Sequence, residues 1–227
     1  MNRRIASALR YASATVLAGL LLAVLSVLFF AWLGEEVLEN DTARFDDRVR
    51  ALVHSEAKPG LTEAMKVTSD VGSPIAVSVL TLAVFAIFWR LRKRRDAVLL
   101  AAAVLGASIV DYALKVSFHR VRPVPFFSLP TPLTFSFPSG HSMLAFCFYT
   151  ALAYLLCSHI AAAGKRVAIW TCAVAIFLLI GLSRIYLGVH YPSDVIAGYA
   201  AGSVWIGTIY TAEQILKRRA NIRQDLG

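Results

Sequence analysis

Long apolar runs without a charged residue alternate along this chain with short clusters of basic residues. The first run, residues 11–34, is longer than the apolar part of a signal peptide and too long for a core strand. An α-helix needs roughly 20 apolar residues to cross a membrane. The pattern therefore predicts an all-α integral membrane bundle of six transmembrane helices, at about residues 11–34, 71–89, 97–114, 139–157, 167–182 and 193–212.

Two stretches depart from this pattern. Residues 35–70 are polar and mixed in charge, with apolar residues at roughly helical spacing. We interpret them as one or two short amphipathic helices at the membrane interface, with a solvated loop as the alternative. Residues 117–138 contain five of the eight prolines and are predicted to form a loop. Ser73 followed by Pro74 has the order of a helix N-cap and a proline in the first turn.

The composition favours a membrane protein over a nucleic-acid-binding one. The hydrophobic fraction is 58%, whereas a soluble domain has about 45–50% apolar residues. The net charge of +9 comes from basic residues between apolar runs, so no nucleic-acid partner is predicted. The three cysteines lie inside apolar runs without zinc-site spacing, which predicts neither a disulfide nor a zinc site.

The distribution of charge predicts the topology. The N-terminal tail, residues 90–96, residues 159–166 and the C-terminal tail together hold 14 of the 23 Lys and Arg residues. The opposite side holds the other nine, together with 11 of the 14 acidic residues. Because cytoplasmic loops are enriched in Lys and Arg, both termini are predicted to be cytoplasmic. Residues 1–227 are expected to form one membrane domain, with 35–70, 115–138 and 183–192 on the outside.

Unusual polar residues lie at the outer ends of the third to sixth predicted spans. Charged side chains at membrane depth are costly and indicate a functional site. Lys115, Arg122 and Arg184 supply the positive charge that a phosphate monoester requires. Ser139 and Gly140 begin a predicted helix, whose free N–H groups favour an anion, and glycine permits close approach. These five residues are therefore candidate phosphate ligands.

Two histidines supply the groups that hydrolysis needs. Asp194 follows His190 by four residues, so its carboxylate can hold one ring nitrogen and aim the other as a nucleophile. His141 lies beside the candidate phosphate site and can protonate the leaving group. The sequence contains no cluster of carboxylates that would hold magnesium, so we expect neither a metal nor a cofactor.

Three motifs occur in order: K-x6-R-P at residues 115–123, P-S-G-H at 138–141 and S-R-x5-H-x3-D at 183–194. Together they resemble the signature of the type 2 phosphatidic acid phosphatase superfamily. The resemblance implies that His190 forms a phosphohistidine, that Asp194 orients it and that His141 protonates the leaving group. It also implies a phosphate site made by Lys115, Arg122, Ser139, Gly140 and Arg184.

The resemblance further implies a multi-pass enzyme of the bacterial inner membrane that acts on a lipid phosphate at the periplasmic or outer face, without an obligate protein partner. Candidate substrates are undecaprenyl diphosphate or its monophosphate, phosphatidylglycerol phosphate, phosphatidic acid and a lipid A phosphate. Two other functions are weighed. Vanadium haloperoxidases have a similar pocket but are soluble, and an anion or lipid transporter is disfavoured because the cations cluster at one face.

Several nearby residues receive simpler interpretations. Arg120 is predicted to anchor its helix to lipid head groups. Asp111 shares a helix face with Lys115, where it either tunes that lysine or hydrogen-bonds another helix. His119 is expected to pack at the interface, with substrate contact as the alternative. Packed or interfacial positions are also expected for His54, His159, Tyr186, Tyr191 and Trp205.

Overall fold

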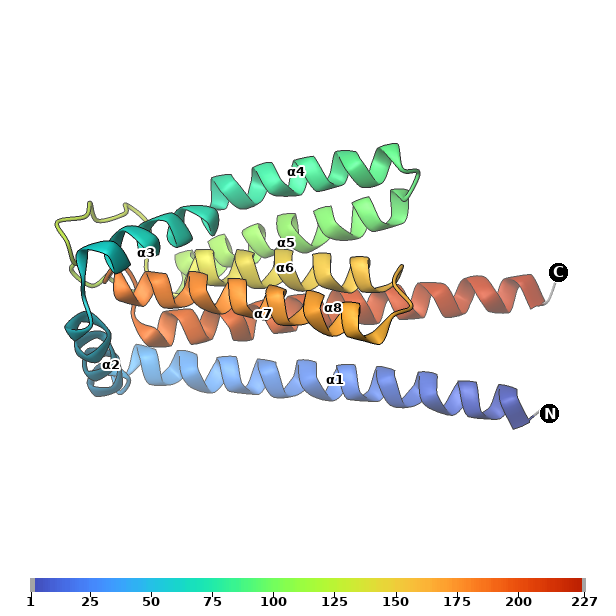
Figure 1. Cartoon of the computed structure of the whole chain (residues 1–227). Helices are drawn as coiled ribbons and strands as arrows, with labels where there is room; N and C mark the ends of the chain where they lie inside the picture. The colour runs from blue at the N-terminus through green and yellow to red at the C-terminus, as the bar shows by residue number, and fades with distance from the viewer. Residues whose placement is uncertain (1–2, 226–227) are drawn as a thin grey trace.

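The computed structural model describes the backbone of residues 3–225 and the side chains of residues 19, 21 and 23–217. The chain within these limits forms eight α-helices: α1 (Arg3–Leu38), α2 (Ala43–Ser55), α3 (Pro59–Val71), α4 (Pro74–Arg90), α5 (Arg94–Phe118), α6 (Gly140–Cys157), α7 (Ala163–Tyr186) and α8 (Pro192–Asp225). The long helices lie side by side, with both ends of the chain at one end of the bundle and α2, α3 and the loop after α5 at the other (Figure 1).

Four helices, α5 to α8, are long and apolar enough to cross a membrane. The consecutive helices α3 and α4 meet at an angle of 53° and provide a fifth candidate if they form one broken span. The predicted span at residues 11–34 falls within α1, but several of its side chains lie outside the described residues. The described part of the chain is therefore all-helical with four or five candidate spans, and the number six stays a prediction.

The segments between the spans follow the sequence pattern. Residues 35–70 contain α2 and nearly all of α3, so the prediction of one or two short helices is confirmed and the solvated-loop alternative is wrong. The Oγ of Ser73 accepts a hydrogen bond from the N–H of Ala76 at 3.1 Å, which confirms the predicted N-cap of α4. No regular element interrupts residues 119–139, as the prolines predicted.

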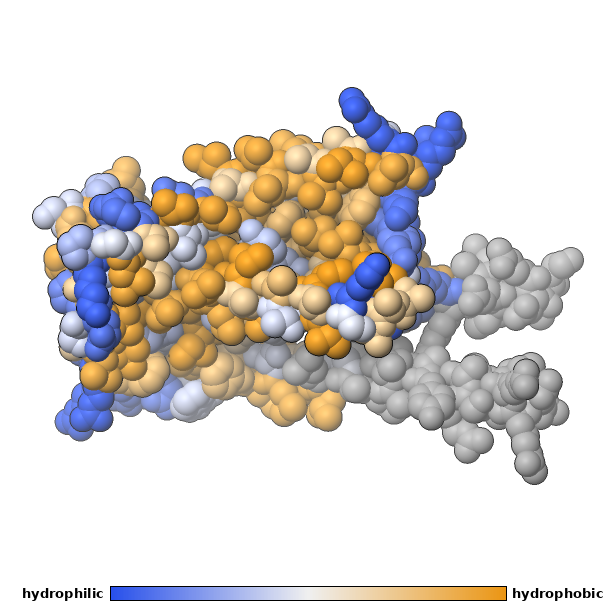
Figure 2. Space-filling view, in the orientation of Figure 1, coloured by the Kyte–Doolittle hydropathy of each residue, from blue (hydrophilic) through white to orange (hydrophobic). Residues whose placement is uncertain are grey.

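The centre of the bundle is α6, which packs against α5, α7 and α8. Its inward face buries Met143 and Phe148 against Leu100 and Val104 of α5. Between helices in a membrane such contacts stabilise through van der Waals packing, because lipid tails are as apolar as these side chains. Apolar side chains also cover most of the coloured face of the bundle seen in Figure 2, whereas hydrophilic ones gather toward its ends. This distribution is typical of a protein whose sides contact lipid.

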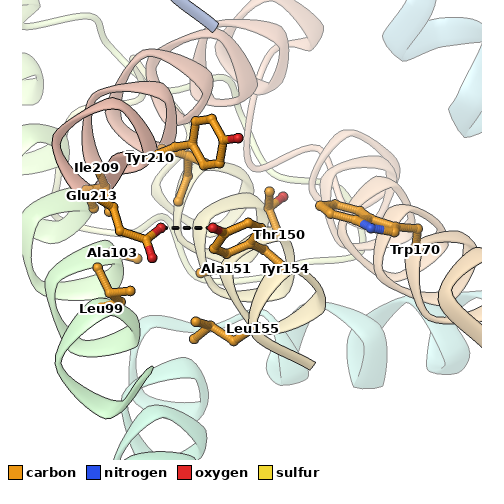
Figure 3. Close-up of a pocket in the computed structure, with 11 residues that line it drawn as sticks. Leu99, Ala103, Thr150, Ala151, Tyr154, Leu155, Trp170, Ile209, Tyr210 and Glu213 are labelled. Carbon is orange, nitrogen blue, oxygen red and sulfur yellow. Dashed lines mark hydrogen bonds between the residues drawn. The ribbon is translucent and has the colours of Figure 1, made fainter. Parts of the chain in front are cut away.

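A largely apolar pocket of about 160 Å³ lies between α5, α6, α7 and α8 (Figure 3). Its buried carboxylate, Glu213, accepts a hydrogen bond from Tyr154 at 2.9 Å and pairs with Arg95 and with Lys217. Glu213 follows Asp194 on α8 by about 19 residues, which corresponds to roughly 28 Å of helix. This ion cluster therefore ties α5, α6 and α8 together far from the candidate catalytic residues.

Candidate active site

A sharp turn between α7 and α8 carries His190. Gly188 adopts a φ of 73° there, a conformation that glycine enters without strain. A Cβ at this position would lie 2.6 Å from the ring of Phe126, so the turn has no room for a side chain. The N–H of Phe126 also donates to the carbonyl of Leu187 at 3.0 Å, which holds the loop after α5 against the turn. His190 is thereby buried at the start of α8, with 1% of its surface exposed.

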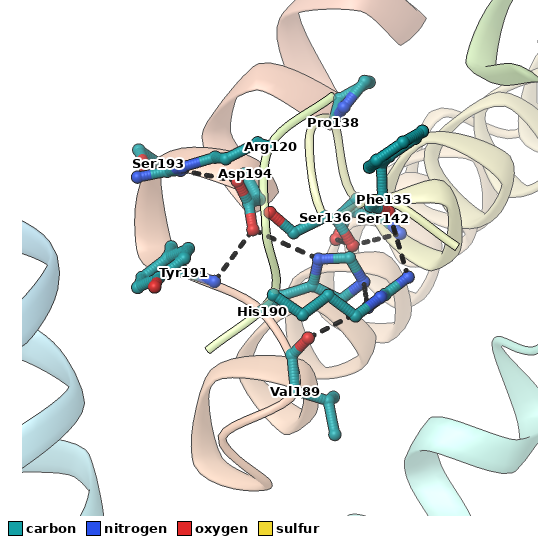
Figure 4. Close-up of polar contacts among 12 residues, drawn as sticks. Arg120, Phe135, Ser136, Pro138, Ser142, Val189, His190, Tyr191, Ser193 and Asp194 are labelled. Carbon is teal, nitrogen blue, oxygen red and sulfur yellow. Dashed lines mark hydrogen bonds and ion pairs between the residues drawn. The ribbon is translucent and has the colours of Figure 1, made fainter. Parts of the chain in front are cut away.

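Asp194 holds one ring nitrogen of His190, as their spacing predicted. The Nδ1 atom lies 3.3 Å from Oδ2 of Asp194, which also accepts the N–H of Tyr191 at 2.9 Å (Figure 4). Since a carboxylate only accepts, Nδ1 carries the proton and Nε2 presents its lone pair. Burial lowers the pKa of His190 well below its usual range, and nearby cations lower it further. The imidazole is therefore neutral and its Nε2 is a potential nucleophile.

The guanidinium of Arg122 contacts Nε2 of His190. Its Nη1 is 2.9 Å from Nε2 of His190 and donates to the carbonyl of Val189 at 2.9 Å. Its Nε donates to the carbonyl of Thr134 at 2.6 Å. The loop after α5 thus brings a predicted phosphate ligand into contact with the predicted nucleophile, although 68 residues separate them in the sequence.

The N-terminus of α6 faces the same site. Ser139 caps the helix, because its Oγ accepts the N–H of Ser142, and its own N–H donates to the carbonyl of Asp194 at 2.9 Å. A Cβ on Gly140 would lie 2.8 Å from Oδ2 of Asp111, which gives this glycine a packing reason besides the predicted approach of a ligand. The half-buried His141 is close enough to be influenced electrostatically by His190, Lys115, Arg122 and Arg184.

The other two predicted cations, Lys115 and Arg184, donate hydrogen bonds to protein atoms. Lys115 donates to Asp111 at 2.6 Å, which favours the tuning of this lysine over the alternative of a bond between helices, and to the carbonyl of Pro138 at 2.5 Å. Arg184 at the end of α7 donates through Nη1 to the Oγ of Ser69 on α3. Its Nε is buried and has no hydrogen-bond acceptor among the described residues. Buried donors of this kind require an acceptor, and a phosphate oxygen would supply one.

The prediction for Arg120 as a head-group anchor is wrong. Its Nη1 donates to Oδ1 of Asp194 at 2.6 Å, and its Nη2 donates to Oδ2 of Asp46 at 2.8 Å. Burial opposes the charge on Arg120, but Asp194 and Asp46 outweigh that effect and raise its pKa. Arg120 therefore points inward because two buried carboxylates hold it there, and it is drawn beside Asp194 in Figure 4.

No functional role was predicted for Asp46 from the sequence. It lies on α2 in the polar segment 35–70, and none of the three motifs contains it. A lone carboxylate among several charged residues of an amphipathic helix resembles a solvated face. The sequence offers no signal that separates Asp46 from its exposed neighbour Asp47.

Apart from Tyr191, whose N–H binds Asp194, the other residues that received simple interpretations lie outside the contacts made by His190. His119 is exposed and packs edge-on against Phe135, with ring centroids 4.6 Å apart. Tyr186 is buried and its hydroxyl lies 2.9 Å from that of Thr62. The three cysteines are free thiols; Cys147 and Cys157 are buried, whereas Cys172 is exposed on α7.

Comparison with known proteins agrees with this arrangement. The model of the PAP2 superfamily matches residues 96–218. Phosphatidylglycerophosphatase B of Bacillus subtilis is 31% identical over 84% of this chain and 94% of its own length. The undecaprenyl-diphosphatase of Sulfolobus acidocaldarius is 31% identical over 56% of this chain and 64% of its own.

A solved structure supports the same assignment. The crystal structure of a transmembrane PAP2 type phosphatidylglycerolphosphate phosphatase from Bacillus subtilis superposes with a TM-score of 0.79 at 30% identity, covering 86% of this chain and 98% of that one. The soluble haloperoxidases that share the pocket motif do not fit the four or five candidate spans. The motifs, the fold and the relatives agree, and the chain is a multi-pass membrane protein that belongs to the PAP2 superfamily.

Proposed function

We propose that this protein is a lipid phosphatase in which Nε2 of His190 attacks the phosphorus of a lipid phosphate. One observation carries the proposal: His190 is held through Nδ1 by Asp194 at 3.3 Å and faces the cation Arg122 with Nε2 at 2.9 Å. A nucleophile that is oriented on one side and placed beside an anion-binding group on the other has the arrangement required for covalent phosphoryl transfer.

A bound phosphate would replace the protein atoms that now accept hydrogen bonds from these cationic side chains. Arg122 would turn from Nε2 to the phosphate oxygens, while Arg184 would offer its unpartnered Nε. Lys115 and the N–H groups at Ser139 and Gly140 complete the proposed site, where the α6 dipole favours a negative charge.

The reaction divides into two displacements at phosphorus. An N–P bond forms at Nε2 of His190 as the bond between phosphorus and the lipid oxygen breaks, and His141 gives its proton to that oxygen. His141 then takes a proton from water, whose oxygen attacks the phosphohistidine and releases inorganic phosphate. Asp194 stays ionised and keeps Nδ1 protonated throughout.

The proposed substrate is phosphatidylglycerol phosphate, because the relative that matches 84% of this chain is a phosphatidylglycerophosphatase. Purified protein in mixed micelles should release phosphate faster from this lipid than from phosphatidic acid, undecaprenyl diphosphate or a lipid A phosphate. Equal or faster release from another lipid of the panel would reassign the substrate, and release from none would contradict the proposed activity.

The proposed membrane arrangement has six spans over residues 1–227, both termini in the cytoplasm and the catalytic region, residues 115–194, opening outside. It rests on the excess of Lys and Arg at the end of the bundle that carries the termini. The segment 35–70 would then lie at the outer interface, next to the lipid head group.

Cysteine labelling tests this arrangement. With Cys172 replaced by alanine, a cysteine at the exposed Ser128 should react with an impermeant thiol reagent added to intact cells. A cysteine at the exposed Ala161, between α6 and α7, should react only after lysis. The reverse pattern would place the active site in the cytoplasm.

Metal removal provides a further prediction. Among the described residues, no group of three or more His, Cys, Asp or Glu side chains is arranged to hold a metal ion. Since Arg122, Arg184 and Lys115 supply the charge that a metal would otherwise supply, phosphate release should persist in EDTA. Loss of activity that magnesium restores would show that a metal takes part.

A further inference from the structure

A buried chain of charges links α2 to the proposed nucleophile. It runs from Asp46 through Arg120 and Asp194 to His190, with contacts of 2.8, 2.6 and 3.3 Å. We propose that Asp46 and Arg120 are positioning residues, which fix the carboxylate of Asp194 and thereby aim Nε2 of His190. The inference rests on the proposed function, because it concerns how that nucleophile is held.

Asp46 is engaged on every side. It has no exposed surface, although it belongs to a short helix with many charged residues. Its Oδ1 accepts the N–H of Ser193 at 2.9 Å, and its Oδ2 accepts the hydroxyl of Ser193 at 2.7 Å and Nη2 of Arg120 at 2.8 Å. A single side chain of α2 thus binds both the first turn of α8 and the arginine that contacts Asp194.

The hydrogen bonds among Asp46, Ser193, Arg120 and Asp194 form a closed ring. Arg120 Nη1 donates both to the Oγ of Ser193 at 2.8 Å and to Asp194, while its other end is held by Asp46. The planar guanidinium also stacks on Tyr191, with 4.2 Å from its central carbon to the ring centroid. The fork of an arginine fixes the direction of a carboxylate, which a point charge such as lysine does less well. Neither Asp194 nor Arg120 can rotate without breaking several of these bonds.

The ring matters because the hydrogen bond that it supports, between His190 and Asp194, is long. The distance from Nδ1 of His190 to Asp194 is 3.3 Å, at the long end for a hydrogen bond. Rotation of the Asp194 carboxylate would turn the imidazole and move Nε2 away from the line of attack. A misplacement of about 1 Å far from the chemistry can reduce a rate by about 10²-fold. Loss of the ring should therefore lower kcat more than it changes KM.

The test compares two variants with matched controls in the purified full-length protein. Asp46→Asn is paired with Asp47→Asn on the same helix, and Arg120→Ala is paired with Arg48→Ala, since both control residues are exposed. We expect kcat for p-nitrophenyl phosphate to fall about 10- to 10²-fold in Asp46→Asn and at least about 10²-fold in Arg120→Ala, with KM changed less than about twofold. The controls should match wild type.

Guanidinium rescue separates positioning from folding. A cleft of about 480 Å³, lined in part by Val37, Leu38 and Val121, reaches Arg120 and would admit a guanidinium ion in the alanine variant. Millimolar guanidinium should raise kcat of Arg120→Ala about tenfold and leave that of Asp46→Asn and wild type unchanged. If Arg120→Ala does not fold, Arg120→Lys carries the test, with kcat lowered at least about tenfold at constant KM.

Each outcome decides the inference separately from the proposed function. Wild-type kcat in Asp46→Asn, or no rescue of a folded Arg120→Ala, overturns the positioning role. If Arg120→Lys is tested in place of Arg120→Ala, a wild-type kcat in Arg120→Lys overturns the positioning role. Phosphohistidine trapped on wild type and absent from His190→Ala, measured in the same series, would leave the proposed function standing in those cases. Its absence from wild type would overturn the proposed function itself.

Discussion

The His190→Ala variant is expected to release phosphate at background rate from every substrate, including activated aryl phosphates. His190 supplies the only protein atom proposed to form a bond to phosphorus, so its removal closes the covalent route instead of slowing one step of it. The loss should be at least about 10⁵-fold, a substantial part of the acceleration that enzymes achieve.

The comparison needs a histidine outside the site and a variant that keeps the ring. His159→Ala, which alters a histidine between α6 and α7 that is paired with Asp96, at the other end of α6 from His141, should retain wild-type activity. Asp194→Asn keeps the size of its side chain but misorients the imidazole, so its activity should fall between wild type and His190→Ala. Activity of His190→Ala within tenfold of wild type would exclude His190 as the nucleophile.

The second large effect is expected from His141→Ala, and it should depend on the substrate. A general acid contributes about 10²–10⁴-fold when the leaving oxygen is a poor leaving group, as in a lipid alkyl phosphate. The p-nitrophenolate of an aryl phosphate leaves with little protonation. The variant should therefore lose distinctly more activity on phosphatidylglycerol phosphate than on p-nitrophenyl phosphate.

The ratio of the two losses is the informative quantity. Arg122→Ala serves as the comparison, because it removes a proposed phosphate ligand and should reduce the hydrolysis of both substrates to a similar extent. Equal losses on both substrates in His141→Ala would indicate that His141 binds the phosphate and does not act as the acid.

Much of this architecture follows from local sequence. The apolar runs predicted α5 to α8, and the capping pattern at Ser73 and the prolines after residue 117 predicted where helices begin and end. These features depend on residues within a few positions of one another. Helices α1, α5, α7 and α8 are longer than the predicted spans because polar end residues, such as Arg94 in α5, continue the helix beyond its apolar part.

The candidate site was predicted only in part, because the sequence indicates contacts between residues that are close along the chain and not contacts between distant ones. The pairs His190 with Asp194 and Lys115 with Asp111 are four residues apart on one helix or at its start, so spacing alone indicated the contacts. Asp46 meets its partners only across the fold, 74 residues from Arg120.

A long-range contact of this kind leaves no local periodicity. An arginine near a membrane end therefore looked like an anchor until the structure placed two carboxylates around it.

The phosphoryl-enzyme is the most direct test of the central claim. Protein quenched during turnover of a ³²P-labelled lipid phosphate should carry label that is stable in base and lost in acid, as expected for a phosphohistidine. The label should map to His190 and be absent from His190→Ala, while His141→Ala should still acquire it from an aryl phosphate. Label that persists in His190→Ala, and that disappears in His141→Ala even with the aryl phosphate, would show that the two histidines have the opposite roles.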